Sequence, residues 1–404
     1  MFFSLCMFTA GTAQTIFSVS VRNTLGTART DQPVVLSLGG YGPVASALVT
    51  DGSTEVPCQL DDLDQDDQMD ELCFLADLKA REEKTYTVKL FAEGKPREYA
   101  ARVYAEMVMG NKNVKEKNKQ NNFIESITAR GDCAYSYNLQ HHHGVDFESE
   151  LNGIRIYFDK RQTLDLYGKY QKRLELQATQ FYTSDEQKSQ GYGDDVLWVG
   201  NTFGLGAFRG WDGEQPTMID PVRSRTQRVI SYGPLRTIVE VVDRGWEAPL
   251  PGTAKPAKPI NMTLRYTQYA GHRDTDVDVL FSHDVSAYRF STGVINVKGS
   301  VEFSDHKGLR ACWGTDYPST DTLKWKRETV GLAVLIPREN IVSEQPANKD
   351  NYAFVVAAKG KTMSYKVAYC SANETFGYHS PDEWFDWLKA WRKEADNPVI
   401  VSKK

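Results

Sequence analysis

The stretch NMTLRYTQYAGHRDTDVDVLF, residues 261–281, decides the fold class. Its apolar residues occupy alternate positions in two runs: Met262, Leu264 and Tyr266, then Val277, Val279 and Phe281. A period of two is typical of a β-strand with one buried face, because alternate side chains of a strand point to opposite sides. Gly271 stands between the two runs, where a turn is expected. The stretch therefore predicts two antiparallel strands joined by a turn.

The same alternation recurs along most of the chain, for example over residues 17–21, 34–38 and 86–90. Turn signals such as Asp51-Gly52 and Asp212-Gly213 separate these runs. Strand follows strand without intervening helical patterns, which favours an antiparallel all-β protein over a βαβ one. Because 404 residues exceed a simple sandwich, we expect one large two-sheet β-sandwich domain over residues 14–404.

One helix is predicted near the end of the chain. Ser380 is a favourable N-cap, Pro381 suits the first helical position, and Glu383 stands at the capping-box position. The residues that follow place an apolar stripe at helical spacing: Trp384, Trp387, Leu388 and Trp391. We expect a short C-terminal helix over about residues 381–394, packed on the edge of the sandwich.

The charge balance excludes some classes of protein. Lys and Arg number 48 and Asp and Glu number 53, which gives a formal charge of −5. A nucleic-acid-binding protein normally carries a marked basic excess, so we expect no nucleic-acid partner. No run approaches the roughly 18 apolar residues that span a bilayer, so we expect no membrane span.

The first residues suggest export. Met1–Ala10 is an apolar run, and small residues follow at Gly11-Thr12-Ala13, as in a signal-peptide cleavage site, although no positive residue precedes Arg22. We interpret residues 1–13 as the remnant of a signal peptide and expect a periplasmic or secreted protein. In an oxidising compartment Cys58 and Cys73 could pair, and buried free thiols are the alternative.

An acidic run, DDLDQDDQMDE at residues 61–71, resembles the start of a calcium-binding loop. Asp62, Asp64 and Asp66 have the spacing of the first ligands. The pattern then fails, because Asp67 stands where glycine is needed and Cys73 where a bidentate Glu is needed. A solvated loop is the favoured interpretation.

Three consecutive histidines, His141, His142 and His143, are conspicuous in a chain with seven histidines in all. In an extended segment His141 and His143 would share one face. A divalent metal held by these two residues and a carboxylate is therefore left open, although no cofactor is required. Asp146, Glu148 and Glu150 alternate with less polar residues, which is typical of a solvated strand face; paired carboxylates for hydrolysis are the alternative.

Aromatic residues, glycines and cations gather farther along, in DLYGK (165–169), GYGDD (191–195) and residues 198–211. Together with the histidines they suit β-elimination from a uronic acid, in which the C6 carboxylate is neutralised, a base removes the C5 proton and an acid assists the group leaving C4. We predict His142 or His143 as the base and Tyr167 or Tyr192 as the acid. Lys169 and Arg209 are predicted to bind the carboxylate, and Trp198 and Trp211 to stack on the sugar ring.

Three runs resemble a known family: HHHGVDFESELNGIRIYFDKRQTLDLYGK (141–169), GYGDDVLWVGNTFGLGAFRGW (191–211) and SYGPLRTIVEVVDRGW (231–246). They are similar to the family catalogued as domain of unknown function 4861, which is common in polysaccharide-utilisation loci of Bacteroidetes-type bacteria. The resemblance covers about residues 17–395. It implies a galactose-mutarotase-like supersandwich and, from some members, removal of water from a terminal uronic acid of an oligosaccharide. It supplies no catalytic residues.

We therefore expect a carbohydrate-active enzyme that acts on an anionic oligosaccharide or polysaccharide, specifically on a terminal uronic acid, as a lyase or dehydratase that leaves a 4,5-unsaturated sugar. A glycoside hydrolase or mutarotase-like epimerase on the same fold is one alternative. A glycan-binding protein without catalysis is another.

Overall fold

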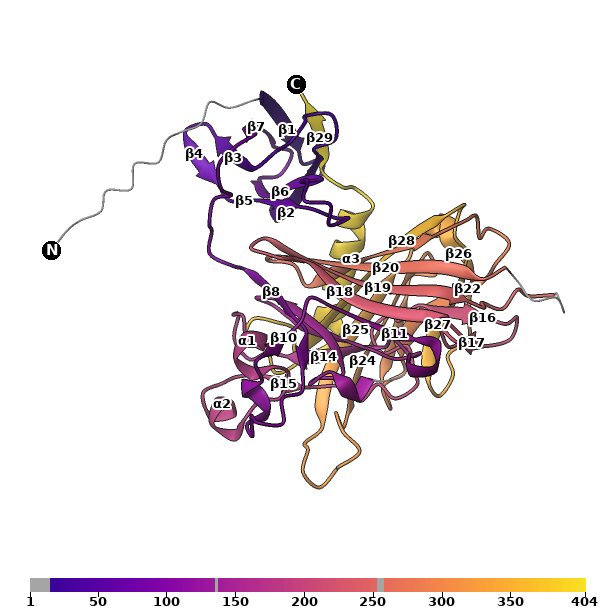
Figure 1. The fold of residues 1–404 in the computed structure, drawn as a ribbon. Coiled ribbons are helices and arrows are strands. Elements are labelled where there is room, and N and C mark those ends of the chain that lie inside the picture. Colours follow the sequence, from indigo (N-terminus) through magenta and orange to yellow (C-terminus); the bar gives the residue numbers. More distant parts are fainter. Residues whose placement is uncertain (1–14, 135–136, 253–257) are drawn as a thin grey trace. The chain divides into compact units, whose positions relative to one another are not determined.

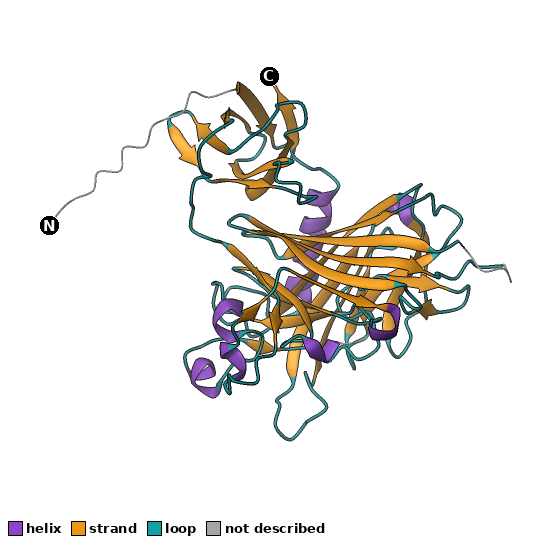
Figure 2. Cartoon of the chain, in the orientation of Figure 1, coloured by secondary structure: helices purple, strands orange, loops and turns teal. Residues whose placement is uncertain are grey.

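The computed structural model describes residues 15–134, 137–252 and 258–404. The predicted signal-peptide remnant, residues 1–13, lies outside them. Strands hold 46% of the residues and helices 9%, and the paired strands run antiparallel (Figures 1 and 2). The predicted all-β class is confirmed.

The chain divides into two compact units, whereas the sequence suggested one domain over residues 14–404. The first unit comprises the described residues up to Ala101 and the final segment, Asp396–Lys404; the second is Arg102–Ala395. The period of two that marks the strands continues through both units, so it carries no signal of the boundary between them.

The first unit contains two antiparallel sheets around its own core. The five-stranded sheet has the order β29 (Ile400–Lys403), β1 (Thr15–Arg22), β7 (Glu83–Phe91), β3 (Ser46–Asp51) and β4 (Thr54–Val56). The three-stranded sheet has the order β2 (Arg29–Ser37), β6 (Glu71–Leu78) and β5 (Cys58–Asp61). The predicted turn Asp51-Gly52 joins β3 to β4, with Gly52 at a φ of 59° that favours glycine. Cys58 and Cys73 are both buried free thiols.

The second unit is built on a nine-stranded sheet. Its order is β11 (Ser126–Arg130), β18 (Ser224–Tyr232), β19 (Arg236–Trp246), β20 (Ile260–Tyr269), β21 (Asp274–Phe281), β28 (Thr362–Ser371), β25 (Glu328–Leu335), β24 (Leu309–Asp316) and β23 (Val301–Ser304). The stretch quoted at the outset forms β20 and β21, paired with Tyr266 opposite Val277.

Three smaller sheets complete this unit. One has the order β15 (Asp194–Asp195), β14 (Leu164–Gly168), β13 (Gly153–Tyr157), β12 (Gly144–Ser149) and β8 (Val103–Glu106). Another has the order β17 (Pro216–Thr217), β16 (Arg209–Trp211), β22 (Phe290–Ile295), β27 (Asn351–Val356) and β26 (Ile341–Glu344). The third pairs β10 (Asn122–Phe123) with β9 (Val108–Met109).

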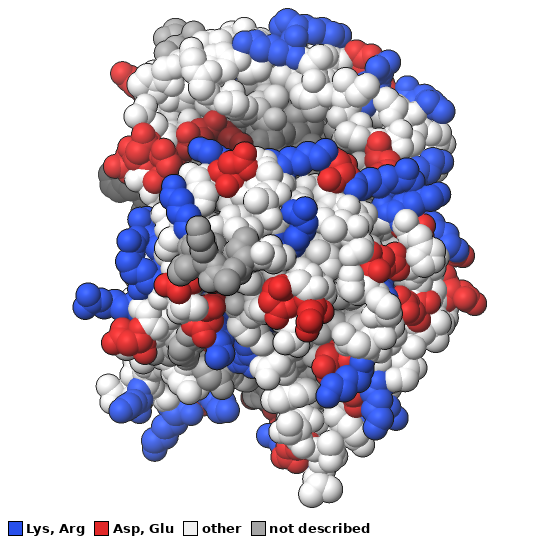
Figure 3. Space-filling view, turned by 90° about the vertical axis from the view of Figure 1, so that its right-hand side faces the viewer, with Lys and Arg blue, Asp and Glu red and all other residues white. Residues whose placement is uncertain are grey.

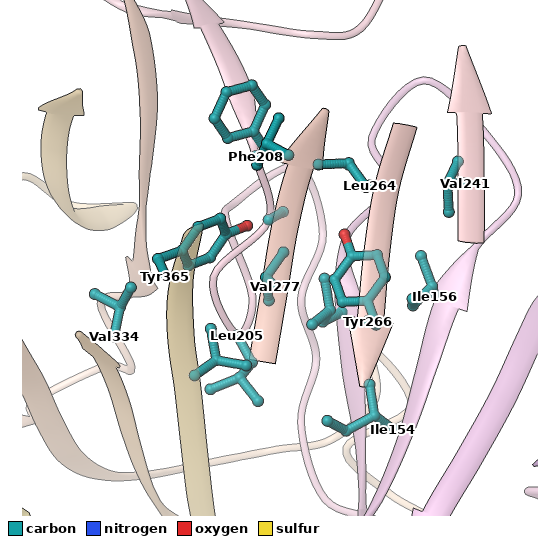
Figure 4. Packing of buried hydrophobic residues seen from close by; sticks show 14 of the residues in the cluster. Ile154, Ile156, Leu205, Phe208, Val241, Leu264, Tyr266, Val277, Val334 and Tyr365 are labelled. Carbon is teal, nitrogen blue, oxygen red and sulfur yellow. The ribbon is translucent and has the colours of Figure 1, made fainter. Parts of the chain in front are cut away.

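One hydrophobic core serves the nine-stranded sheet and both five-stranded sheets of this unit. Figure 4 shows part of it, with Ile154 and Ile156 of β13, Leu264 and Tyr266 of β20, and Val277 of β21. The unit is thus a two-layer sandwich, with the nine-stranded sheet facing the other two sheets across buried side chains.

The predicted C-terminal helix is α3 (Pro381–Ala395), which packs against β24 and β25. Trp384, Leu388 and Trp391 are buried and Trp387 is partly buried, in a core cluster separate from the main one. Ser380 Oγ accepts a hydrogen bond from the Glu383 N–H at 3.3 Å. The Glu383 carboxylate accepts the N–H of His379, not that of Ser380, so the capping box is only half formed.

Candidate functional site: a buried charged face beside the histidine run

The sheet formed by β15, β14, β13, β12 and β8 has one apolar and one charged face. Val145 and Phe147 of β12 point into the main core. Asp146 alternates with them and therefore lies on the opposite face. In the strand register Asp146 stands opposite Glu106 on β8 and Arg155 on β13, and Arg155 stands opposite Asp165 on β14. Four charged side chains from four strands thus form one row.

This charged face is buried, so the interpretation of a solvated strand face is wrong for Asp146 and Glu148. Both side chains are 0% exposed. The chain after β14 supplies part of the cover: α1 (Leu176–Thr179) contacts β8 and β12, and the ring of Phe181 lies 4.1 Å from the Arg155 guanidinium. Alternation showed that two faces exist, but it could not show that a later segment covers the polar one. Glu150, at the end of the strand, is partly exposed and pairs with Arg102 at 2.5 Å.

Arg155 balances the carboxylates at one end of the row. Its Nη2 donates to Asp165, to Asp195 Oδ2 at 3.3 Å and to the Tyr157 hydroxyl at 2.9 Å. Burial and the nearby Asp165 raise the pKa of Asp195 well above its usual value. The guanidinium also lies 4.9 Å from the centre of the Tyr157 ring.

The other end of the row has a histidine in place of an arginine. We call Glu106, His142 and Asp146 the carboxylate–histidine cluster. His142 Nε2 lies 3.4 Å from Glu106 Oε1 and 3.5 Å from Asp146 Oδ2, and all three side chains are at most 1% exposed. Burial, followed by the charges of Glu106 and Glu148, raises the pKa of Asp146 well above its usual value.

The histidine run is a turn, not an extended segment. The N–H of His143 donates to the carbonyl of Gln140 at 3.2 Å, and His143 has a φ of 69°. As a result His141 and His143 do not pair on one strand face; the rings of His141 and His142 instead meet edge to face at 5.5 Å. The grouping that could hold a metal contains His142 with Glu106 and Asp146, and neither His141 nor His143.

Partly exposed rings adjoin the cluster. The His141 ring lies 5.2 Å from that of Tyr182, and the His143 ring lies 6.4 Å from that of Tyr157. Burial, followed by the neighbouring His142 and Lys117, lowers the pKa of His141 to about 4. Two cations rest on these tyrosines, Lys117 at 5.0 Å from the Tyr182 ring and Arg161 at 4.8 Å from the Tyr157 ring. These six residues form what we call the rim: Lys117, His141, His143, Tyr157, Arg161 and Tyr182.

Tyr167 and Tyr192, predicted as acids, are separate from the rim. Tyr167 is fully buried on β14, and its hydroxyl contacts Glu175, Thr183 and the Gly193 carbonyl. Tyr192 stacks at 4.0 Å on the guanidinium of Arg173. Their catalytic role stays a prediction.

The predicted cations are buried and already bonded. The Lys169 ammonium contacts Glu148 and the carbonyls of Ser149 and Arg173. Arg209 donates to Thr163 Oγ1 at 3.0 Å and to backbone carbonyls. Both side chains therefore have structural partners, and a role in binding a substrate carboxylate stays a prediction.

The two predicted stacking residues have different environments. Trp211 on β16 is only 8% exposed, whereas Trp198 is 52% exposed. Trp198 lines an open cleft of about 680 Å³ together with Tyr317, Asp316, Glu328 and Lys349. Arg209 lines a neighbouring cleft of about 380 Å³. None of the three histidines lines either cleft.

The acidic run at residues 61–71 forms a loop in the first unit. Carboxylate oxygens of Asp62, Asp64 and Asp70, one from each residue, lie within 4.8 Å of one another in this loop. Asp66, which the sequence pattern suggested as the third ligand, does not belong to this group. The Asp62 carboxylate accepts the N–H groups of Gln65, Asp66 and Asp67, which closes the turn without an ion.

Sequence reasoning missed Glu106 and Arg155. Arg155 interrupts an apolar strand between Ile154 and Ile156, inside a run that resembles the family, and that contrast was a usable signal. Glu106 lies 40 positions before Asp146 and gave no local signal, because only the pairing of β8 with β12 brings the two together.

The fold and this site define a class: an antiparallel β-sandwich protein with a buried carboxylate–histidine cluster under a rim of rings and cations. Its sequence identifies the family more closely. The chain belongs to the family described as Domain of unknown function (DUF4861), whose profile matches residues 21–401.

The chain is similar to solved structures at low sequence identity. A protein in glycosyl hydrolase family 38 from Enterococcus faecalis matches at 10% identity with a TM-score of 0.51, over 96% of this chain and 47% of that chain. An alpha-mannosidase from Enterococcus faecalis V583 matches at 10% identity with a TM-score of 0.49, over 96% and 46%. This chain thus spans about half the length of both. No curated protein matches.

Two further observations concern partners. None of the helices in the described segments is long and apolar enough to cross a membrane. On the face shown in Figure 3, Lys and Arg are interspersed with Asp and Glu.

Proposed function

We propose that the protein is a carbohydrate-active enzyme that acts on a terminal uronic acid of an oligosaccharide by β-elimination, as a lyase or a dehydratase. The observation that carries the proposal is the rim. It combines the cation Lys117, which suits a carboxylate, with tyrosine rings, which suit the apolar face of a sugar, and with imidazoles, the usual bases near neutral pH.

The reaction needs three groups. A base removes the C5 proton, the electron pair of that bond forms the C4=C5 double bond, and the C4–O bond breaks as an acid protonates the leaving oxygen. A dehydratase releases water, and a lyase releases the preceding sugar, which keeps the protonated oxygen as a new hydroxyl group. A cation beside the C6 carboxylate makes the C5 proton more acidic.

We assign the base to His143 and the acid to Tyr182. His143 is partly exposed, whereas His142 is fully buried. Tyr182 is partly exposed, and burial raises the pKa of its hydroxyl, which therefore keeps its proton at neutral pH. Lys117 is assigned to the substrate carboxylate, because Arg161 already forms an ion pair with Asp159 at 2.5 Å.

The test is incubation with oligosaccharides that end in glucuronate or iduronate, followed by the ultraviolet absorbance of the conjugated 4,5-unsaturated product. His143→Ala and Tyr182→Phe should each lower kcat by roughly 100-fold or more. His306→Ala is the matched control, because His306 is 81% exposed and pairs with Glu344. Wild-type rates for both rim variants would overturn the assignment, and release of reducing ends without the absorbance would overturn elimination.

A second candidate, glycoside hydrolysis, is favoured by the open cleft. Asp316 and Glu328 stand opposite each other on β24 and β25, beside the exposed ring of Trp198. Paired carboxylates next to an exposed aromatic ring suit a hydrolase. Loss of hydrolysis in Glu328→Gln, with His143→Ala unaffected, would establish this candidate in place of the first.

A further inference from the structure

The carboxylate–histidine cluster directs three potential ligand atoms at one point. One oxygen of Glu106, one oxygen of Asp146 and one ring nitrogen of His142 lie within 4.8 Å of one another. The backbone fixes this convergence, because Glu106 and Asp146 are register partners on adjacent strands and His142 precedes the second of these strands by two residues.

The tautomer of His142 follows from its other nitrogen. Nδ1 lies 2.9 Å from the carbonyl oxygen of Gly144. A carbonyl only accepts, so Nδ1 carries the hydrogen and donates it. In the neutral ring Nε2 then has a free lone pair directed at the two carboxylates. This is the state in which a histidine binds a metal, with its second nitrogen held by a backbone carbonyl.

The ligand atoms have no other hydrogen-bonding role within the described part of the chain. Neither carboxylate oxygen of Asp146 accepts a hydrogen bond from another described residue, and the same holds for Glu106 Oε1 and His142 Nε2. The second oxygen of Glu106 accepts the Tyr104 hydroxyl at 2.6 Å, which orients the carboxylate. Buried polar atoms are rarely left without a partner. Four such atoms at one place therefore indicate that they bind a ligand together.

The negative charge of the cluster also indicates that it binds a ligand. Among the described residues, no Lys or Arg forms an ion pair with Glu106 or Asp146, whereas Arg155 serves Asp165 and Asp195. Glu148, two residues after Asp146 and equally buried, has Lys169. Two buried carboxylates without a cation are unfavourable. The partner that fits is therefore positively charged and small.

We propose that Glu106, His142 and Asp146 bind one divalent cation. Two carboxylate oxygens and one imidazole nitrogen suit Mn²⁺ or Zn²⁺ among the common ions. Three protein ligands leave coordination positions for water or a substrate oxygen, as in catalytic rather than structural sites.

The test measures metal binding without any sugar. The full-length protein is stripped with a chelating resin and titrated with Mn²⁺, and free Mn²⁺ is followed by its electron paramagnetic resonance signal; Zn²⁺ is tested by competition. We expect one ion per chain. His142→Ala and Glu106→Gln should each weaken binding at least about tenfold, while His306→Ala, a surface histidine beside a carboxylate, should bind as the wild type does.

Folding is checked independently by near-ultraviolet circular dichroism, and Asp146→Asn serves as a variant expected to fold well and still lose the ion. Absence of saturable binding of either ion at millimolar concentration would overturn the site, as would wild-type affinity in the three cluster variants. Metal binding in a protein with no elimination activity would support the site and refute only the proposed reaction.

Discussion

Asp146 and Glu148 offer a matched pair of substitutions with opposite expected signs. They lie two residues apart on β12, are equally buried, and differ in their partners. Glu148 accepts from the Lys169 ammonium at 2.5 Å and from the N–H groups of Glu175 and Leu176 at 2.7 to 2.9 Å. Asp146 faces Glu106 and forms no ion pair with a Lys or Arg of the described residues, although Arg155 stands opposite it on β13.

The magnitudes follow from these contacts. When both carboxyls are ionised, at a pH above the raised pKa of Asp146, unit charges on Asp146 and Glu106, whose ligand atoms lie within 4.8 Å, repel by about 3.5 kcal/mol at an effective dielectric constant of about 20. Asp146→Asn removes this repulsion, so the free energy of unfolding of the metal-free protein should rise by about 1–3 kcal/mol. The gain is smaller than the repulsion because burying the new amide is itself unfavourable. Glu148→Gln leaves Lys169 buried without its counter-charge and should cost about 3–5 kcal/mol.

The assay is denaturant and thermal unfolding of metal-free protein, followed by tryptophan fluorescence. All 8 tryptophans lie between residues 198 and 391, so the signal reports the unit Arg102–Ala395 alone. A shift of roughly 2–4 °C per kcal/mol is expected for a unit of this size. Destabilisation of the metal-free Asp146→Asn variant comparable with that of Glu148→Gln would refute the reasoning, because Asp146 would then have a stabilising partner.

Three further outcomes are expected. Trp384→Ala removes a ring of α3 that is 0% exposed, and should lower the free energy of unfolding by about 3–5 kcal/mol in urea unfolding monitored by circular dichroism. A loss below about 1 kcal/mol would contradict this packing. Asp243→Asn removes the carboxylate that accepts from Arg225 Nε at 2.7 Å, both side chains being 0% exposed, and should cost about 3–5 kcal/mol by the same measurement; a neutral effect would disprove the pair. Burial raises the pKa of the Cys58 thiol to about 11, so at pH 8 little thiolate exists and a disulfide reagent should label it far more slowly than the exposed Cys133; equal rates by mass spectrometry would contradict its burial.

Much of the fold could be predicted because its signals are local. The period of two in residues 261–281 identified β20 and β21, and Ser380-Pro381 with the tryptophan stripe located α3 to within one residue of its end. The half-formed capping box could not be foreseen, since the carboxylate of Glu383 had a choice between two adjacent N–H groups. The division into two units depends on which strands pair, and residue patterns within strands do not encode it.

The candidate site could be predicted only in part. The three consecutive histidines are visible in the sequence, but the turn that they form depends on a positive φ at His143, which a non-glycine residue does not predict. Whether Asp146 is solvated depends on a cover supplied by residues about 30 positions later, including Leu176 and Phe181. Glu106 reaches the cluster through strand pairing alone. Residue patterns within one segment do not predict such contacts between distant parts of the chain.

We propose that the chemistry occurs at the rim beside the carboxylate–histidine cluster and not in the open cleft. The most direct test compares the elimination rate of His143→Ala with that of Trp198→Ala on one uronate-terminated oligosaccharide. We expect His143→Ala to lose roughly 100-fold or more in rate and Trp198→Ala to keep the wild-type rate. Full activity in His143→Ala together with loss of activity in Trp198→Ala would contradict this proposal and place the reaction in the cleft.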